Sequence, residues 1–338
     1  MNSPDKITFS FGENWKNYLS TIDGRVLQVA SEDIEEWIGT PQIKGKRVVD
    51  VGSGSGLSSL CFYNASPAEL VSFDYDEHSI EATKSLRDRV YATGIWKIMR
   101  GSILDKSFLE QLETFDVVYS WGVLHHTGSI WAAIENTQKL CTVGGLVLIS
   151  IYQAGDMYQR HLALKKEFNR MSSAEKQKAI ERHALEAFPG STVSEAISKM
   201  RSNVVRRGMN EYNDWIDWLG GLPYEVAYPS EIISRFLAQG FLPIGVMEGE
   251  QGGCSVYLFR KEQEGVPSDI NAKFSWSHII NPSVSESRRL VDQISHDFGK
   301  AVRDAQFLSG REVVIRAAKT RLKRLFGRLV NLPSSGSI

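Results

Sequence analysis

The chain has few cysteines and no long apolar run. Its three cysteines, Cys61, Cys141 and Cys254, stand far apart, without the spacing of a zinc site or the density of a disulfide framework. No stretch of the 338 residues approaches the roughly 18 apolar residues that span a bilayer, and the first residues lack the apolar core of a secretory signal. We therefore expect a cytoplasmic protein without a metal site.

An excess of charge is also missing. Thirty-nine basic residues against 40 acidic ones leave a formal net charge of −1. A nucleic-acid-binding domain is normally clearly basic, so nucleic acid is not the expected partner. The hydrophobic fraction of 42% is that of an ordinary globular protein, and the length allows an accessory region beside one α/β core.

Short apolar runs alternate with helical patterns between residues 47 and 152. Strands are predicted over 47–51, 70–73, 98–100, 115–120 and 146–152, with helices between them, the last of which ends at the Gly144–Gly145 pair. This alternation predicts a doubly wound, mostly parallel α/β sheet with right-handed crossovers. A helix over 229–240 and two further apolar runs, LPIGVM and CSVYLFRK, predict an antiparallel hairpin that completes seven strands.

Composition divides the chain further. The sheet domain is expected over 45–153 and 229–262, and an N-terminal helical segment, 1–44, should cover its binding site. Residues 154–228 are polar and helix-forming, which predicts a helical lid inserted over the strand ends. Residues 263–338 should form a linker and a basic C-terminal helical extension.

The most distinctive motif is a glycine-rich loop after the first strand, 49–56 (VDVGSGSG). Alternate glycines allow a sharp turn and a close approach to a ligand, and the next helix offers free N–H groups to an anion. A nicotinamide-binding loop would need GxGxxG, but its third glycine position is Leu57.

Three more strand ends carry polar or unusual residues. Asp74 closes the second strand, where an acid can accept two ribose hydroxyls, whereas Asp76 is the expected helix cap. Residues 101–105 (GSILD) follow the third strand, where backbone can bond an adenine edge and Ile103 can pack on its face. Residues 120–126 (SWGVLHH) follow the fourth strand. Ligands of such sheets bind at these strand ends, so four elements in order are far more specific than one.

Together these elements resemble the Rossmann-like class I S-adenosylmethionine-dependent methyltransferases of the quinone and small-molecule methylase type. The resemblance is tight over Gly45–Tyr152 and looser over Phe9–Leu19 and Asp217–Ile232, two segments similar to a bacterial subgroup with mostly unassigned acceptors that often accompanies cell-surface glycan or secondary-metabolite pathways. It implies S-adenosylmethionine as the cofactor.

The resemblance also implies the cofactor contacts. Many relatives have Asp at the position of Ser102, so either Ser102 or Asp105 would bond the adenine here. The expected contacts are Asp50, Gly52, Ser53, Gly54 and Gly56 around the methionine part, Asp74 and Tyr75 at the ribose, Ser102 and Ile103 at the adenine, and Ser120 and Trp121 beside the sulfonium.

Methyl transfer is an in-line displacement, which needs positioning and, for a hydroxyl acceptor, removal of a proton. The candidate bases are His125 and His126, because an unperturbed histidine has a pKa of about 6.5. The alternative is that one histidine caps the following helix and the pair only shapes the pocket wall.

Acceptor contacts are expected from Tyr212, Tyr224 and Glu225 in the insertion, whereas Trp215 and Trp218 are expected to anchor it. Phe11 and Trp15 should cover the cofactor.

The fourth strand end lacks the Asn/Asp-Pro-Pro-aromatic motif of amino-methylating DNA enzymes. No cysteine follows a proline, as carbon-5 pyrimidine methylation would need, and no carboxylate cluster suits metal-assisted catechol methylation. The favoured acceptor is a small molecule, a hydroxyl of a glycan precursor or secondary metabolite.

Two alternatives remain open at this stage. An RNA or protein methyltransferase could dock through residues 311–330, a basic amphipathic helix by pattern, and a cofactor-binding protein without turnover would keep the same motifs. The same helix could instead lie on an anionic membrane, or pack on the domain or a second subunit with its charges in solvent, which the pattern favours.

Overall fold

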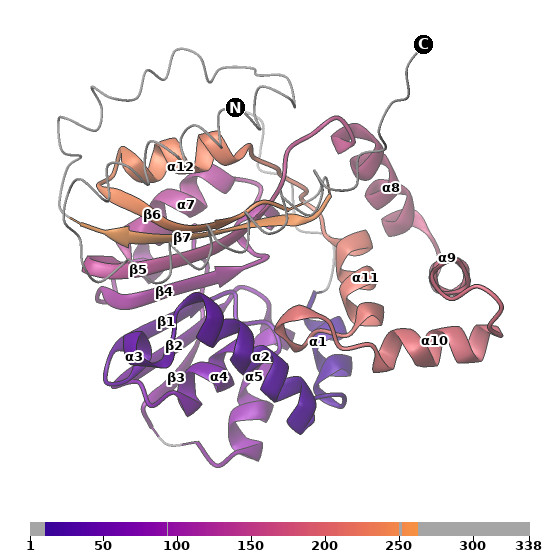
Figure 1. The fold of residues 1–338 in the computed structure, drawn as a ribbon, viewed down its shortest axis with the longest axis horizontal. Helices are drawn as coiled ribbons and strands as arrows, with labels where there is room; N and C mark the ends of the chain where they lie inside the picture. Colours follow the sequence, from indigo (N-terminus) through magenta and orange to yellow (C-terminus); the bar gives the residue numbers. More distant parts are fainter. Residues whose placement is uncertain (1–10, 93, 250–251, 263–338) are drawn as a thin grey trace, which may run out of the picture.

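The computed structural model describes residues 11–92, 94–249 and 252–262. Within them the chain forms one seven-stranded sheet in the order β3-β2-β1-β4-β5-β7-β6 (Figure 1). β1 to β5 pair in parallel, and β7 runs antiparallel to both β5 and β6. The predicted mixed sheet with its closing hairpin is thus confirmed. The strands are β1 (Arg47–Val51), β2 (Glu69–Asp74), β3 (Trp96–Arg100), β4 (Phe115–Trp121), β5 (Cys141–Tyr152), β6 (Phe241–Met247) and β7 (Cys254–Lys261).

Helices cover both faces of the sheet and extend from one end of it (Figure 1). They are α1 (Phe11–Leu19), α2 (Gly24–Trp37), α3 (Thr40–Ile43), α4 (Leu57–Asn64), α5 (Glu77–Arg89), α6 (Lys106–Leu109), α7 (Ile130–Lys139), α8 (Tyr158–Arg170), α9 (Ser173–Ala187), α10 (Val193–Ser202), α11 (Glu211–Gly220) and α12 (Pro229–Leu237), with short 3-10 turns η1 (Leu124–His126) and η2 (Arg206–Gly208).

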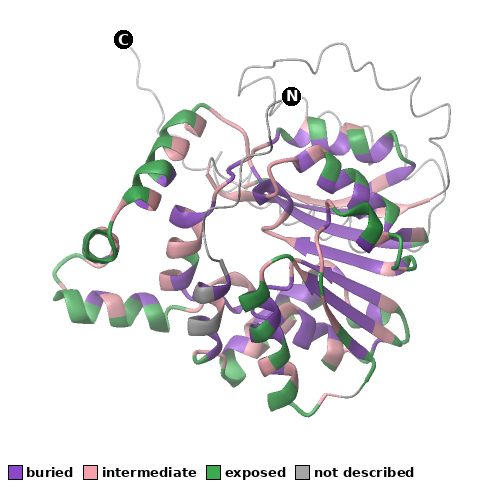
Figure 2. Cartoon of the chain, turned by 180° about the vertical axis from the view of Figure 1, so that it is seen from behind, coloured by how far each residue is buried: buried purple, intermediate pink, exposed green. Residues whose placement is uncertain are grey.

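The central strands are apolar because both of their faces are covered. Side chains of β1 alternate between two clusters: Val49 packs with α7 and α12, and Val48 packs with α2 and α4. Figure 2 shows the strands as almost continuously buried. Continuous burial on both faces is the reason that these strands read as uninterrupted Val, Ile and Leu runs rather than alternating ones.

The inserted residues between β5 and α12 form helices, as predicted. α9 and α10 each begin with a capping box, Ser172 with Glu175 and Thr192 with Glu195, in which side chain and backbone bond reciprocally. These two helices stand away from the sheet and are largely exposed (Figures 1 and 2). Local capping hydrogen bonds therefore fix where these two helices begin, because the helices bury few apolar side chains.

Two strand starts differ from the prediction by two residues or more. β3 begins at Trp96 rather than residue 98, because the buried Trp96 indole donates a 2.8 Å hydrogen bond to Ser72 of β2. β5 begins at Cys141, so the glycine pair lies inside a strand; a Cβ on Gly145 would sit 2.9 Å from the Asp116 carbonyl oxygen of β4. Close approach of backbone, not a helix stop, accounts for Gly145.

The predicted linker and basic extension over 263–338, including 311–330, lie outside the described residues. In the part of the chain that is described, no helix combines the length and apolar character needed to cross a membrane.

Candidate functional site

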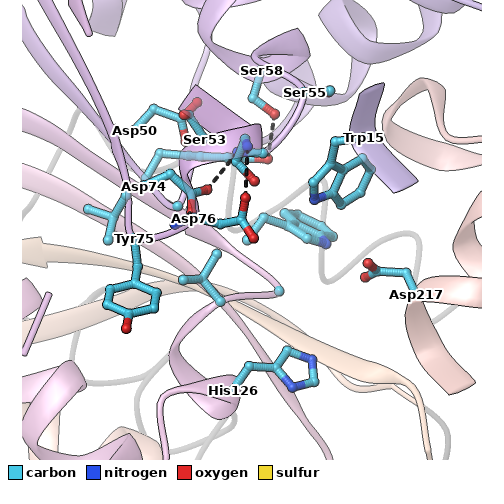
Figure 3. Close-up of a pocket in the computed structure, with 18 of the residues that line it drawn as sticks. Trp15, Asp50, Ser53, Ser55, Ser58, Asp74, Tyr75, Asp76, His126 and Asp217 are labelled. Atoms are coloured by element: carbon cyan, nitrogen blue, oxygen red, sulfur yellow. Dashed lines mark hydrogen bonds between the residues drawn. The ribbon is translucent and has the colours of Figure 1, made fainter. Parts of the chain in front are cut away.

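A cavity of about 1120 Å³ opens at the carboxyl ends of the strands (Figure 3). The sheet order reverses between β1 and β4, the switch point at which such sheets bind ligands. Most of the predicted cofactor contacts meet there, although they come from four separate strand ends. Those that line the cavity are Asp50, Gly52, Ser53, Gly54, Asp74, Tyr75, Ser102, Ile103 and Trp121.

The glycine loop is held between two side chains. Gly52 has φ +76°, and a Cβ there would lie 2.3 Å from a methyl carbon of Val123. Gly54 has φ +54°, and a Cβ there would lie 3.1 Å from the Trp15 indole nitrogen. Both positions need glycine for conformation and for space. Trp15 of α1 thus lies against the loop; its predicted role as a cover over the cofactor stays a prediction, and the Phe11 side chain lies outside the described residues.

Asp50 lies beneath this loop, 2% exposed. Its carboxylate accepts a 2.5 Å hydrogen bond from the Ser59 hydroxyl of α4, and Ser59 in turn bonds Ser72 of β2. Burial raises the pKa of Asp50 to about 7, and the neighbouring Asp74 carboxylate adds to that rise. Asp50 therefore ties two strands to a helix while carrying a charge that a cationic ligand would stabilise.

Asp74 is held by backbone N–H groups. It accepts bonds from Gly54 at 3.0 Å and from Asp76 at 2.9 Å, yet burial raises its pKa to about 6. Asp76 caps α5 through the N–H groups of His78 and Ser79, as predicted. The three aspartates make this half of the cavity negative, which suits a ligand with net positive charge.

At the third strand end, Ser102 lines the cavity and Asp105 does not. The Asp105 carboxylate caps α6, accepting from Ser107 at 3.0 Å and Phe108 at 3.3 Å. Since its oxygens already serve the helix, Ser102 is the better placed of the two predicted adenine contacts.

The two histidines have different surroundings. His126 lines the cavity, and its Nδ1 donates to the Pro223 carbonyl oxygen at 2.7 Å, so Nε2 is the acceptor of the neutral ring. His125 is fully buried, and its Nδ1 accepts from the Tyr152 N–H at 3.2 Å. Burial lowers the pKa of His126 to about 3 and that of His125 well below its ordinary value. Only His126 therefore faces the cavity, as a neutral ring.

The remaining predicted residues do not line the cavity. Ser120 is buried and donates to the Val51 carbonyl oxygen at 3.1 Å, and Gly56 opens α4. Glu225 accepts from the Ile130 N–H and thereby begins α7, a position that the alternative interpretation gave to a histidine. Tyr212 and Tyr224 also lie outside the lining, the latter stacked on Tyr158. Acceptor contact by Tyr212, Tyr224 and Glu225 stays a prediction.

Several lining residues were not predicted from sequence. Asp214 and Asp217 of α11 lie three positions apart on one helix face, and Arg207 approaches Asp214 at 3.8 Å from η2. Trp218 combines two roles: its indole N–H donates to the Gly252 carbonyl oxygen, as an anchor would, and its ring lines the cavity. The three-residue spacing could have indicated from sequence that the two aspartates share a helix face, whereas no sequence pattern indicated Arg207.

α8 is fastened to α11 by a buried lysine. Lys165 is 0% exposed; its ammonium donates to the Trp218 carbonyl oxygen and lies over the rings of Trp218 (4.5 Å), Tyr224 (4.7 Å) and Tyr152 (5.3 Å). Desolvation lowers its pKa to about 7. The aromatic rings offset part of the cost of burying this charge.

α1 and α11 are joined by a reciprocal amide pair. Asn14 donates to the Asn213 carbonyl oxygen at 3.1 Å, and Asn213 donates back to the Asn14 side-chain oxygen at 2.6 Å. Both side chains are buried. The pair links the helix that carries Trp15 to the helix that carries Asp217. Among the described residues, no cluster of three or more His, Cys, Asp or Glu side chains is suited to hold a metal ion.

Comparison with known proteins gave one family match and many structural ones. The family, described as a methyltransferase domain, matches residues 25–188. No curated protein matches the chain. One similar solved structure is magnesium protoporphyrin IX methyltransferase of Synechocystis with bound SAH, at 15% identity over 69% of this chain and 82% of that chain, with a TM-score of 0.43. A second is a putative S-adenosyl-L-methionine-dependent methyltransferase of Methanococcus maripaludis, at 14% identity over 79% of this chain and 100% of that chain, with a TM-score of 0.45. A third is PKMT2 of Rickettsia typhi in complex with AdoHcy, at 15% identity over 69% of this chain and 53% of that chain, with a TM-score of 0.47.

The family match includes the glycine loop, Asp74 and His126, and the sheet around them has the predicted mixed, doubly wound architecture. Three buried or capping aspartates and a conformationally demanding glycine loop surround one cavity at its switch point. The chain therefore carries a methyltransferase domain over residues 25–188.

Proposed function

We propose that this enzyme transfers the methyl group of S-adenosylmethionine to a hydroxyl of a small-molecule acceptor, a glycan precursor or a secondary metabolite. One observation carries the proposal: the predicted cofactor contacts and the face of α11 line the same cavity. Its volume of about 1120 Å³ exceeds the ~300–1,000 Å³ typical of a site for one small ligand, which leaves room for an acceptor beside the cofactor.

In this proposal the strand ends hold the cofactor. Asp50 and the glycine loop lie at its methionine part, Asp74 and Tyr75 at its ribose, and Ser102 and Ile103 at its adenine. A sulfonium and an ammonium against one carboxylate give the cofactor net positive charge, which the aspartates complement. Residues 154–228 act as the lid, and Trp121 lies near the sulfonium.

His126 remains the predicted base in its cavity-facing tautomer, although its pKa of about 3 makes it a weak one. Its Nε2 can still orient an acceptor hydroxyl, since the Pro223 carbonyl oxygen fixes which nitrogen accepts. In-line alignment of oxygen, methyl carbon and sulfur would then supply most of the rate enhancement.

Calorimetry with S-adenosylmethionine and S-adenosylhomocysteine tests the cofactor site. We expect binding by the wild-type chain and an affinity loss of about tenfold or more for Asp74→Ala, because a charged hydrogen-bond acceptor is removed. Asp88→Ala, on the exposed side of α5, is the matched control. Absence of binding by the wild type, or unchanged binding by Asp74→Ala, contradicts the proposal.

The acceptor class needs a second experiment. Labelled S-adenosylmethionine is incubated with the enzyme and separate small-molecule, RNA and protein fractions of a cell extract. Label in the small-molecule fraction is expected. Label confined to RNA or protein would reject a small-molecule acceptor and favour docking of a macromolecule.

A further inference from the structure

One side of the cavity is not used by the proposed cofactor contacts. Its wall is one face of α11, which presents Asp214, Asp217 and Trp218 to the cavity. Figure 3 shows Asp217 projecting from its helix towards the middle of the cavity, on the side away from Asp74 and Tyr75. Asp217 Oδ1 is buried and has no hydrogen-bond partner among the described residues. An orphaned carboxylate oxygen in a cavity is costly unless a ligand hydrogen-bonds to it.

The groups around Asp217 leave it available to a ligand. The Asn14 side chain of α1 bonds one part of its carboxyl, and Asp214 lies on its own helix. Lys165 of α8 and Arg207 of η2 act on it electrostatically from a longer distance, but Lys165 donates to the Trp218 carbonyl oxygen and Arg207 pairs with Asp214. Cys254 of β7 lines the same cavity.

The charge of this wall restricts the acceptor. Five carboxylates and one arginine line the described cavity, and two of the carboxylates belong to α11. A phosphate placed beside Asp214 and Asp217 would be repelled and poorly solvated. An ammonium would be attracted, but it has no lone pair with which to attack a methyl group. An uncharged hydroxyl can donate its proton to a carboxylate and still offer a lone pair on oxygen.

The aromatic residues complement hydroxyl recognition. Trp218 lies beside the two aspartates, and Trp15 and Trp121 line the same cavity. Indole rings offer flat apolar faces against which the C–H face of a sugar-like ring packs. Paired carboxylates with flat apolar walls match a ring that has hydroxyls on its edge and C–H groups on its face.

We propose that Asp214, Asp217 and Trp218 form the acceptor subsite, and that it takes the uncharged, polyhydroxylated part of a sugar-like compound, with neighbouring hydroxyls donating to the two aspartates. The inference rests on the proposed function and gives its acceptor a chemical class. Any phosphate on the acceptor lies outside this subsite.

The subsite also provides for the proton of the reacting hydroxyl. The acceptor oxygen forms a bond to the methyl carbon as the carbon–sulfur bond breaks, its electron pair stays on sulfur, and the hydroxyl proton passes to the Asp217 carboxylate. Burial, with Asp214 next, raises the pKa of Asp217 to about 7, so it is a stronger base than His126, whose part in this proposal is to orient the hydroxyl.

Binding and turnover with defined sugars test the subsite. The probes are a panel of neutral methyl glycosides and the matching sugar phosphates and amino sugars, added to the full chain with S-adenosylhomocysteine for thermal-shift and tryptophan-fluorescence titrations, and with labelled S-adenosylmethionine for transfer. We expect glycosides to bind and to be methylated, with sugar phosphates weaker by about tenfold or more because two carboxylates oppose them.

Variants of α11 separate recognition from folding. The double variant Asp214→Asn, Asp217→Asn should weaken glycoside binding by about tenfold or more and reduce the discrimination against phosphate, with cofactor affinity kept. Glu211→Gln on the same helix, outside the cavity, is the matched control and should behave as the wild type. Single Asp214→Asn and Asp217→Asn variants serve if the double variant does not fold.

Three results would overturn the subsite: equal or tighter binding of sugar phosphates, exclusive use of amino sugars, or glycoside binding that the α11 variants leave unchanged. Failure of every glycoside to bind while S-adenosylmethionine binds overturns the subsite alone. Failure of S-adenosylmethionine itself to bind would instead contradict the proposed function.

Discussion

At the scale of single residues, the cavity depends on positions where no other side chain fits. Gly52 combines a positive φ with a Cβ position that Val123 already occupies. Gly190 also has a positive φ, of +82°, but nothing lies within 4 Å of its Cβ position. Substitution of Gly190 would therefore cause backbone strain alone, whereas substitution of Gly52 would cause backbone strain and a steric clash.

Gly52→Ala should displace Val123 and the loop, because the alanine methyl would overlap a valine methyl. We expect a fall in cofactor affinity of about tenfold or more and a clear fall in Tm. Calorimetry and thermal unfolding measure the two effects. Gly190→Ala should lower Tm slightly and leave cofactor affinity unchanged; equal behaviour of the two variants would contradict the role given to Val123.

The buried Asp50 carboxylate makes the stability of the folded protein depend on pH. Its pKa rises from 3.8 when unfolded to about 7 when folded, so the folded protein binds the proton more tightly between these values. The stability that Asp50 contributes therefore falls as pH rises from about 4 to 7. Asp50→Asn cannot titrate, so its Tm relative to the wild type should increase over the same range.

Thermal unfolding without cofactor, recorded from acid to mildly alkaline pH, measures this difference. Glu69→Gln is an informative comparison, because Lys97 and Arg47 hold the pKa of Glu69 below its ordinary value and its pH dependence should have the opposite sign. A Tm difference for Asp50→Asn that does not change with pH would contradict the burial of a titrating carboxylate.

The positions of residues at the cavity could be predicted where a backbone motif dictates them, while their roles as cofactor contacts stay predictions. Asp50 and Asp74 lie at the carboxyl ends of β1 and β2, and the glycine loop and Ser102 follow β1 and β3, so pattern alone placed them at one edge of the sheet. Arg207 was missed because its approach to the cavity depends on how η2 packs, and the spacing of Asp214 and Asp217 places them on one face of α11 without saying that this face meets the cavity.

At the scale of elements, the inserted helices are fastened by few but specific contacts. Lys165 has a pKa lowered from 10.5 to about 7, so between these values the unfolded chain binds the proton more tightly. The stability that this lysine contributes must therefore rise as pH rises from about 7 to 10.

Lys165→Met should lose that rise, so its Tm relative to the wild type should fall between neutral and alkaline pH. The methionine keeps much of the packing against Trp218 but cannot donate to its carbonyl oxygen. Lys166→Met, at the exposed neighbouring position, should show no such trend. Parallel curves for Lys165→Met and the wild type, measured by thermal unfolding across this pH range, would argue against a buried ammonium.

The sequence indicated the existence of this insertion more clearly than its contacts. Charged, helix-forming residues after β5 were enough to place helices over 154–228. The sequence could not show which side of α11 faces the cavity. Trp215 and Trp218 have a helical spacing that is typical both of residues packed in a core and of residues that line a binding site.

For the whole molecule, burial is concentrated in the sheet. Two clusters, each of more than twenty buried residues, lie on its faces, whereas the described cluster around α9 and α10 contains only Ala184, Ala196 and Met200. Local opening should therefore be easiest in α9 and α10.

Hydrogen exchange followed by mass spectrometry should show faster exchange in α9 and α10 than in β1, β4 and β5. Added S-adenosylhomocysteine should protect the strand-end loops first, because they line the cavity. Peptides from α3 and α6, short helices that pack on the sheet, give an internal comparison. Protection of α9 and α10 equal to that of the central strands would mean that these helices unfold only with the sheet.

The architecture was predictable from sequence because four strand ends and a closing hairpin follow one another in a recognisable order. The side of the cavity proposed for the acceptor was not, because the residues that line it come from α1, η2, α11 and β7, which are far apart along the chain. Their meeting is a property of tertiary packing.

The buried amide pair of Asn14 and Asn213 has a thermodynamic consequence. It joins the helix that carries Trp15 to the helix that bears the proposed acceptor subsite, so neither can shift without straining the other. A ligand that stabilises this amide pair from one side would raise the binding affinity of the ligand on the other side. Each ligand must then raise the affinity of the other by the same factor. Donor and acceptor would then bind cooperatively, with the amide pair as their point of linkage.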